Sequence, residues 1–124
     1  MAKAKKTILI AEDEEYNLMY MEELFSNTPF DIIGAGDGQE AINLFKQHTE
    51  IDLVLMDIKM PKVGGVEAMK AIKILNSEMP VIALSAVAMD FEDESLLERG
   101  FDAYLSKPID RAKLFELINK NIYK

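Results

Sequence analysis

The chain has 124 residues, no cysteine and a formal net charge of −8, and 49% of its residues are hydrophobic. This composition fits one globular domain, excludes disulfides and thiolate chemistry, and argues against binding nucleic-acid phosphates through the whole surface. Residues 1–6 are basic, but the apolar run Thr7–Ala11 behind them is too short for a signal peptide or a membrane span. We therefore expect a solvated tail over residues 1–6, a domain over residues 7–124, and a cytoplasmic protein with no direct nucleic-acid or membrane partner.

The first half of the chain alternates between strand and helix patterns. Short apolar runs over Ile8–Ala11 and Phe30–Ala35 predict two strands, and the mixed polarity of the second indicates an edge strand. Each is followed by apolar residues at helical spacing. These residues are Leu18, Met21, Leu24 and Phe25 in the first helix, and Ala41, Leu44 and Phe45 in the second. Asp13 is expected to cap the first helix, which ends near residues 26–29.

The second half continues the alternation. Ile51–Met56 predicts a strand buried on both faces, and it ends on Asp57. Gly64 and Gly65 open a helix. Its apolar face consists of Ala68, Ala71, Ile72 and Leu75. The remaining predicted elements are a strand over Pro80–Leu84, a helix from about Met89 to Arg99 that stops at Gly100, a strand over Asp102–Leu105, and a helix capped by Asp110 that carries Leu114, Leu117, Ile118 and Ile122.

Five strands that alternate with five helices over short loops predict a parallel sheet with right-handed crossovers and helices on both faces. We expect a single doubly wound α/β domain of the flavodoxin-like class, with the strand order 2-1-3-4-5. In this order the first and third strands are neighbours. The crevice at their carboxyl ends is therefore the expected ligand site.

Chemically active side chains follow the predicted strands. They are Glu12 and Asp13 after the first strand, Asp57 after the third, Ser85 after the fourth and Lys107 after the fifth. Unpaired like charges raise one another's pKa values, so three converging carboxylates favour a bound cation. An all-oxygen set without His or Cys suits Mg²⁺ better than Ca²⁺. Together with a lysine and a hydroxyl, these groups could place a phosphoryl group on Asp57.

Four segments in this order and spacing resemble the receiver domain of two-component response regulators. They are Ile8–Glu14, Leu55–Pro61, Ala83–Ala86 and Tyr104–Pro108, and the resemblance covers essentially the whole chain. It implies a phosphorelay protein that accepts a phosphoryl group from the phosphohistidine of a sensor histidine kinase or a histidine phosphotransfer protein. It also implies a switched surface for a downstream partner or effector domain. Such a domain catalyses its own phosphorylation and dephosphorylation but turns over no separate substrate, so we do not expect an enzyme.

The resemblance assigns roles at the predicted crevice. Asp57 is the phosphoacceptor. Asp13, Asp57 and the backbone carbonyl of Lys59 are expected to bind Mg²⁺, and Glu12 is expected to join them directly or through water.

The resemblance also assigns roles in the last two predicted strands. Ser85 and Lys107 are expected to contact the phosphoryl oxygens. Ser85 and Tyr104 are expected to form a switch in which the aromatic ring turns inward as the hydroxyl moves towards the phosphate. The Lys107–Pro108 peptide bond is expected to be cis.

Three positions depart from the family pattern. Glu12 stands where Asp is commonest, and its longer side chain is expected to reach the metal differently. Ser85 replaces the commoner Thr, which keeps the hydroxyl and loses a methyl group. Gly64 stands where many members carry Asp, which is expected to loosen the loop before it. Glu12 with Asn17, and the run Ser85–Met89, most resemble receivers of hybrid sensor histidine kinases.

Three other functions fit parts of the pattern. A degenerate receiver would act as a constitutive protein-interaction domain, but such copies usually lose one of the residues described above, and here they are intact. A flavin-binding electron carrier needs a Ser/Thr/Gly-rich phosphate loop where this chain has the acidic run Glu12–Glu15. A haloacid-dehalogenase-like phosphatase needs a second Asp two residues after the nucleophile, where Lys59 stands.

Overall fold

The computed structural model describes residues 5–85 and 93–123 of the chain. Within these two segments, five strands alternate with five helices along the sequence. The elements are β1 (Lys6–Ala11), α1 (Glu15–Leu24), β2 (Phe30–Ala35), α2 (Gly38–Gln47), β3 (Ile51–Asp57), α3 (Gly65–Leu75), β4 (Val81–Ser85), α4 (Asp93–Arg99), β5 (Ala103–Ser106) and α5 (Arg111–Ile122). None of the described helices is both long enough and apolar enough to cross a bilayer.

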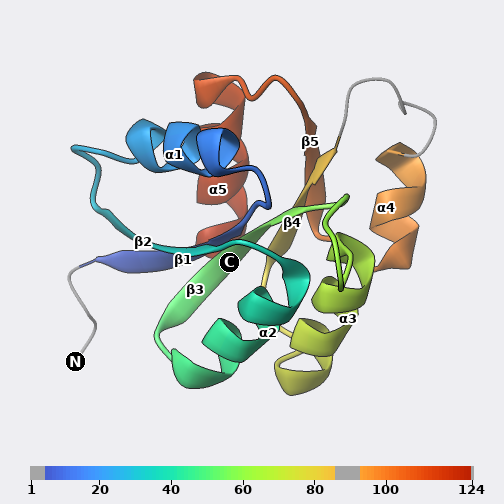
Figure 1. The fold of residues 1–124 in the computed structure, drawn as a ribbon. Helices are drawn as coiled ribbons and strands as arrows, with labels where there is room; N and C mark the ends of the chain where they lie inside the picture. Colours follow the sequence, from blue (N-terminus) through green and yellow to red (C-terminus); the bar gives the residue numbers. More distant parts are fainter. Residues whose placement is uncertain (1–4, 86–92, 124) are drawn as a thin grey trace.

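The strands of the described residues form one parallel sheet in the order β2-β1-β3-β4-β5, as predicted. Figure 1 shows α1 and α5 over one face of this sheet and α2, α3 and α4 over the other. The predicted edge position of β2 is confirmed. This arrangement is the doubly wound α/β fold, in which all strands deliver their carboxyl ends to one edge.

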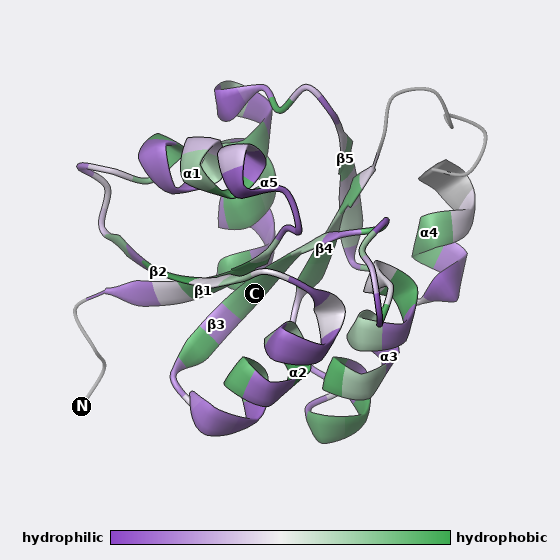
Figure 2. Ribbon diagram, in the orientation of Figure 1, coloured by the Kyte–Doolittle hydropathy of each residue, from purple (hydrophilic) through white to green (hydrophobic). Residues whose placement is uncertain are grey.

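Alternate residues of the central strands fill two separate cores. On the α1 and α5 side the core contains Ile8, Ile10, Leu53, Leu55, Ile82 and Leu84 from the strands. On the α2, α3 and α4 side it contains Leu9, Ala11, Val54, Met56, Val81 and Ala83. Because both faces are covered, the central strands read as continuous apolar runs. Figure 2 shows these hydrophobic strands between helices that carry both hydrophobic and hydrophilic residues.

Several local predictions are confirmed. The Asp110 side chain accepts a hydrogen bond from the backbone N–H of Ala112 and so caps α5. Gly100 ends α4 with a φ of 128°, a conformation that favours glycine. The Lys107–Pro108 peptide bond is cis.

Two local predictions are wrong. The residue that precedes α1 is Glu14, whose side chain makes no capping hydrogen bond, so Asp13 does not cap this helix. Leu75 was expected on the buried face of α3 but is 50% exposed, because it is the last residue of the helix. The predicted start of α4 near Met89 lies outside the described residues.

Candidate functional site

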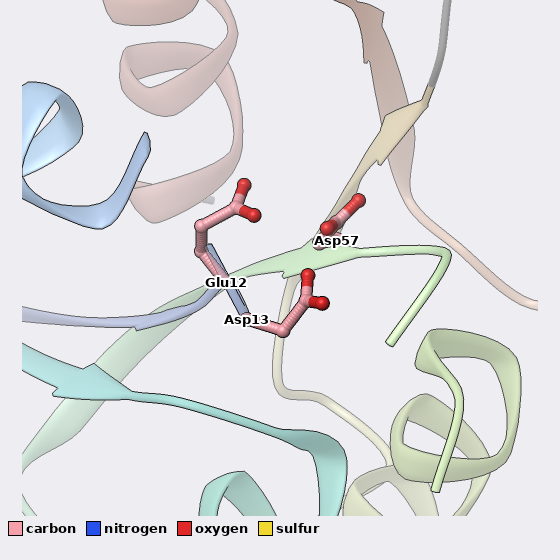
Figure 3. Close-up of side chains that lie close together, drawn as sticks. All are labelled: Glu12, Asp13 and Asp57. Atoms are coloured by element: carbon pink, nitrogen blue, oxygen red, sulfur yellow. The ribbon is translucent and has the colours of Figure 1, made fainter. Parts of the chain in front are cut away.

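Three carboxylates meet at the carboxyl ends of β1 and β3. One oxygen from each of Glu12, Asp13 and Asp57 lies within 4.8 Å of the others. Glu12 and Asp57 are 1% and 5% exposed, whereas Asp13 is exposed. Figure 3 shows Glu12 and Asp13 leaving the end of β1 beside Asp57 at the end of β3.

The pairing of the strands produces this meeting. Ala11 of β1 lies opposite Met56 of β3, so the residues that follow them come side by side at the edge of the sheet. The backbone N–H of Glu12 donates to the carbonyl of Ala35 at 3.0 Å, which extends the pairing with β2 by one residue. The strand register therefore fixes the backbone under both buried carboxylates.

The backbone behind Asp57 is held by close packing of α3. A Cβ added at Gly65 would lie 2.1 Å from the carbonyl oxygen of Asp57, so only glycine allows the helix to begin this close to β3. The N–H of Gly65 also donates to the carbonyl of Ile58 at 2.9 Å, which closes the loop that contains Lys59.

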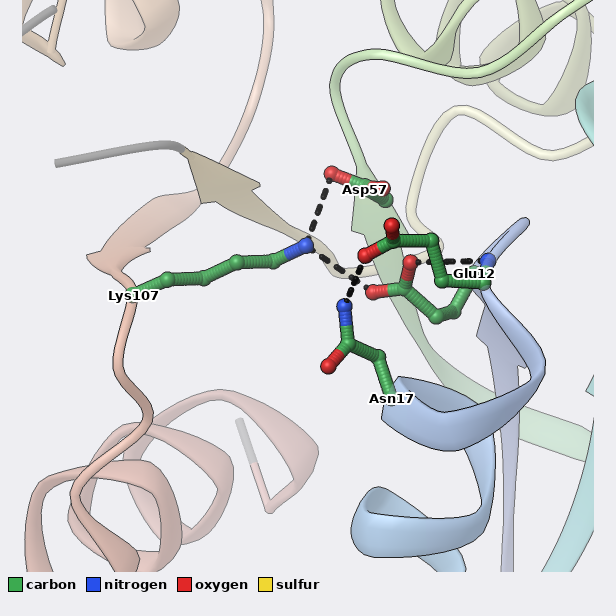
Figure 4. A network of polar contacts seen from close by, with 5 residues as sticks. Glu12, Asn17, Asp57 and Lys107 are labelled. Carbon is green, nitrogen blue, oxygen red and sulfur yellow. Dashed lines mark hydrogen bonds and ion pairs between the residues drawn. The ribbon is translucent and has the colours of Figure 1, made fainter. Parts of the chain in front are cut away.

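Lys107 reaches this site from the end of β5. Its backbone N–H donates to the carbonyl of Ser85 at 2.8 Å, which anchors the start of its side chain beside β4. Its Nζ lies 3.0 Å from Oε1 of Glu12 and 3.4 Å from Oδ1 of Asp57. Figure 4 shows the ammonium between the two carboxylates.

The charges at this edge shift the pKa values of two groups. Burial raises the pKa of Asp57 to about 7, and the negative charge of Glu12 adds to this effect while Lys107 opposes it. For Lys107, burial lowers the pKa, but the hydrogen bond to Glu12 and the charges of Asp57 and Glu12 outweigh it and raise the pKa above its ordinary value. Lys107 is therefore charged at neutral pH, and Asp57 gains or loses its proton there.

A hard cation fits this site. Glu12 and Asp57 share the ammonium of Lys107, and with Asp13 beside them the three carboxylates carry an excess of negative charge. Two of them, Asp13 and Asp57, line an open cleft of ≈ 250 Å³ together with Glu14, Lys59 and Lys107. An oxygen-only donor set with room for water suits Mg²⁺, which keeps several water ligands in its protein sites.

Ser85 and Tyr104 lie on the neighbouring strands. Ser85 is the last residue of β4 and is buried. Tyr104 lies opposite Ala83 on β5 and packs against the core beneath α2, α3 and α4. It also lines a groove of ≈ 450 Å³ together with Leu97 of α4 and Leu117 of α5.

The sequence analysis missed the contribution of Glu14 to the cleft. It was not among the predicted site residues, yet it lines the cleft and accepts a hydrogen bond from Asn17 at 2.5 Å. The available signal was its place in the acidic run Glu12–Glu15, directly after Asp13.

Known proteins with similar sequences carry the same domain. The response regulator receiver domain family matches residues 8–119. The chain is 37% identical to hybrid signal transduction histidine kinase I of Dictyostelium discoideum, in a match that covers 94% of this chain and 7% of that protein. It is 36% identical to the polar-differentiation response regulator DivK of Brucella anthropi, in a match that covers 91% of this chain and 93% of that protein. The chain thus spans a small part of one relative and nearly all of the other.

A solved structure with the same fold comes from a sensor histidine kinase of Pseudomonas aeruginosa. It is a receiver domain described with a magnesium ion coordinated in the active site cleft. The two structures have a TM-score of 0.87 at 28% identity, over 98% of this chain and 100% of that one. Fold, strand-end residues and sequence similarity agree, and the chain belongs to the response regulator receiver domain family.

Proposed function

We propose that residues 7–124 form a phosphoacceptor receiver domain that takes a phosphoryl group onto Asp57 in a Mg²⁺-dependent reaction. The donor is the phosphohistidine of a sensor histidine kinase or of a histidine phosphotransfer protein in the cytoplasm. One observation carries the proposal: the buried carboxylate of Asp57 lies 3.4 Å from a charged ammonium and beside two further acids. A nucleophile, a cation for the phosphoryl oxygens and a place for a metal are thus within reach of one another.

Three side chains would take part in the transfer of the phosphoryl group. An oxygen of Asp57 forms the new bond to phosphorus as the bond between phosphorus and the donor's imidazole nitrogen breaks. Lys107 neutralises charge on the phosphoryl oxygens, and the hydroxyl of Ser85 donates a hydrogen bond to one of them. The same groups support later hydrolysis, so the domain acts on its own phosphoryl group and turns over no separate substrate.

Asp13, Asp57 and the backbone carbonyl of Lys59 would hold Mg²⁺, with Glu12 beside them. The bound ion would neutralise charge on the carboxylates and on the phosphoryl oxygens. The magnesium ion named in the similar receiver of the Pseudomonas aeruginosa kinase supports this assignment. So does the meeting of the Glu12, Asp13 and Asp57 carboxylates, since an excess of nearby negative charge favours a cation.

The donor protein would dock over α1, because Glu14, the residue that precedes this helix, lines the cleft. Three large apolar or aromatic side chains of this helix face solvent. They are Tyr16, Met19 and Tyr20, which are 87%, 56% and 50% exposed. Exposed aromatic side chains are common at the centres of protein interfaces.

The output surface would lie across α4, β5 and α5. Tyr104 is half-buried at the floor of the groove between α4 and α5. A shift of Ser85 towards the phosphoryl group would let the ring of Tyr104 turn inward, which would change the shape of this groove. Phosphorylation would act as a population shift between two surfaces, and a downstream protein or effector domain would bind one of them.

Binding of beryllofluoride, a phosphoryl mimic, tests the proposal. In NMR spectra recorded with Mg²⁺, we expect wild type to show shifts at the ends of β3, β4 and β5 and at Tyr104, and we expect Asp57→Asn to show none. The matched control is Asp31→Asn, because Asp31 is an exposed acid on the edge strand β2. An Asp57→Asn variant that responds like wild type would reject Asp57 as the phosphoacceptor.

A further inference from the structure

The loop between β3 and α3 packs against the first residue of α2. The two helices lie side by side on one face of the sheet (Figure 1). A Cβ added at Gly38, where α2 begins, would lie 2.1 Å from the carbonyl oxygen of Val63 and 2.8 Å from its carbonyl carbon. Because both atoms belong to the backbone, rotation of a side chain could not relieve this contact. Only glycine allows α2 to begin this close to the loop.

The residue before this contact has an unusual backbone conformation. Lys62 has a φ of 66°, in the left-handed region that residues with a side chain rarely adopt. Such a conformation persists where the surrounding structure enforces it, and it is commonest at functional sites. The close contact between Val63 and Gly38 follows Lys62 directly in the chain and restrains the loop at this point.

Asp37 joins the same loop to the cap of α2. Its Oδ1 accepts a hydrogen bond from the backbone N–H of Glu40 at 2.8 Å and so caps the helix. Its Oδ2 lies 3.7 Å from Nζ of Lys62. The Lys62 side chain is 74% exposed, so this ion pair adds little to stability, but it links the loop to the capped end of the helix.

We propose that Gly38 is a positioning residue for the backbone carbonyl of Lys59, which lies in this loop. By allowing α2 to begin against Val63, Gly38 fixes the loop in the conformation in which this carbonyl can serve a metal. The inference deepens the proposed function and rests on it for the metal. It makes the first turn of α2, which supplies no ligand, a determinant of Mg²⁺ affinity.

Mg²⁺ affinity, measured by calorimetry, tests the proposal. We expect Gly38→Ala to weaken binding about tenfold, because the added Cβ displaces the loop that holds a ligand. Gly36→Ala is the matched control, since its Cβ would make an ordinary contact of 3.5 Å with the Glu40 side chain. Asp102→Asn controls for a general loss of stability, because it breaks an ion pair away from the loop.

We expect both controls to bind Mg²⁺ like wild type. An unchanged affinity in Gly38→Ala would overturn the proposal. So would an equal loss of affinity in Asp102→Asn, because the effect would then follow stability and not the position of the loop.

The hold on the loop is measured separately, without metal, by amide hydrogen exchange. The N–H of Gly65 donates to the carbonyl of Ile58 and closes the loop, so its exchange rate reports opening of the loop. We expect this exchange to be about tenfold faster in Gly38→Ala than in Asp102→Asn. Equal rates would overturn the proposal. If wild type binds no Mg²⁺, the proposed function fails, while this measurement still decides whether Gly38 holds the loop.

A reciprocal measurement uses wild type alone and does not depend on the folding of a variant. If the start of α2 affects the metal site, bound metal must affect the start of α2 to the same degree. We therefore expect Mg²⁺ to slow exchange of the N–H groups of Glu40 and Ala41, which bond to Asp37. The N–H of His48 at the far end of α2 is the control and should not respond. Exchange at Glu40 and Ala41 that is unaffected by bound Mg²⁺ would overturn the proposal.

Discussion

The two edges of the sheet carry the same kinds of charged residue in different proportions. At the amino edge, the carboxylate of Asp102 accepts hydrogen bonds from Lys73 Nζ at 2.7 Å and from the N–H of Val81 at 2.8 Å. At the carboxyl edge, Glu12 and Asp57 are more deeply buried, yet they share the single ammonium of Lys107.

The difference separates a structural ion pair from the proposed phosphoacceptor site. Asp102 has a cation of its own and a backbone donor, and it joins α3, β4 and β5. Asp57 shares the ammonium of Lys107 with Glu12, and the charge of Glu12 repels its own. Burial and this repulsion raise the pKa of Asp57 to about 7. Buried acids with too few partners cost stability and are retained where function needs them. Four measurements test this contrast.

The largest expected difference is in stability. We expect Asp102→Asn to lower the free energy of unfolding by about 2 kcal/mol, because Lys73 loses its partner while only partly exposed. At pH 8 we expect Asp57→Asn to cause no loss, because it removes a charge that repels Glu12. Urea unfolding of both variants measures the difference. Equal losses would mean that the two edges do not differ as described.

The pH dependence of Mg²⁺ binding sharpens the contrast. Since the pKa of Asp57 is about 7, a proton competes with the metal below neutral pH. We expect the affinity to rise about tenfold between pH 6 and pH 8, in step with ionisation of Asp57. Calorimetric titrations at several pH values measure this. A pH-independent affinity over that range would contradict the raised pKa.

Ionisation of Asp57 should also change the stability of the metal-free protein. Here a rise in pH lowers stability, whereas it raises the affinity for Mg²⁺. In the unfolded chain Asp57 loses its proton near pH 4, and in the folded protein near pH 7. Between these values the folded state holds the extra proton, so stability falls as the pH rises. We expect wild type to lose about 1 kcal/mol relative to Asp57→Asn between pH 5 and pH 7.5, allowing for solvent at the cleft. Urea unfolding at several pH values measures this. The same pH dependence of the free energy of unfolding in both proteins would contradict the prediction.

The smallest expected effect concerns the loop behind the site. Gly64 precedes α3 without a capping side chain, and a Cβ there would meet its nearest neighbour at 3.7 Å, which is an ordinary contact. We expect Gly64→Asp to stabilise the protein by about 0.3 kcal/mol through capping. The contrasting variant is Gly65→Ala, whose Cβ would collide with the backbone of Asp57 and should destabilise the protein. Denaturant midpoints distinguish the two outcomes.

The general plan of the fold and of the site could be predicted from the sequence. Parallel strands end at one edge, so the residues after four apolar runs had to gather there. The direction of single side chains could not be predicted in the same way. Asp13 after a strand and before a helix suits a cap as well as a cleft, and only the folded backbone shows that it does not cap.

Contacts between distant residues were also beyond the sequence pattern. Asp102 and Lys73 are 29 positions apart, and nothing local marks them as partners. The hydrogen bond from Lys107 to Glu12 joins residues 95 positions apart and depends on the lengths of both side chains. Such pairings follow from the packed structure, whereas strand ends follow from periodicity.

The most direct test of the central claim is the intact mass of the protein after incubation with acetyl phosphate. We expect wild type to gain one phosphoryl group only when Mg²⁺ is present, and Asp57→Asn to gain none under any condition. A wild-type protein that gains no mass with or without Mg²⁺ would contradict the account. The chain would then be better described as a constitutive interaction domain with the receiver fold.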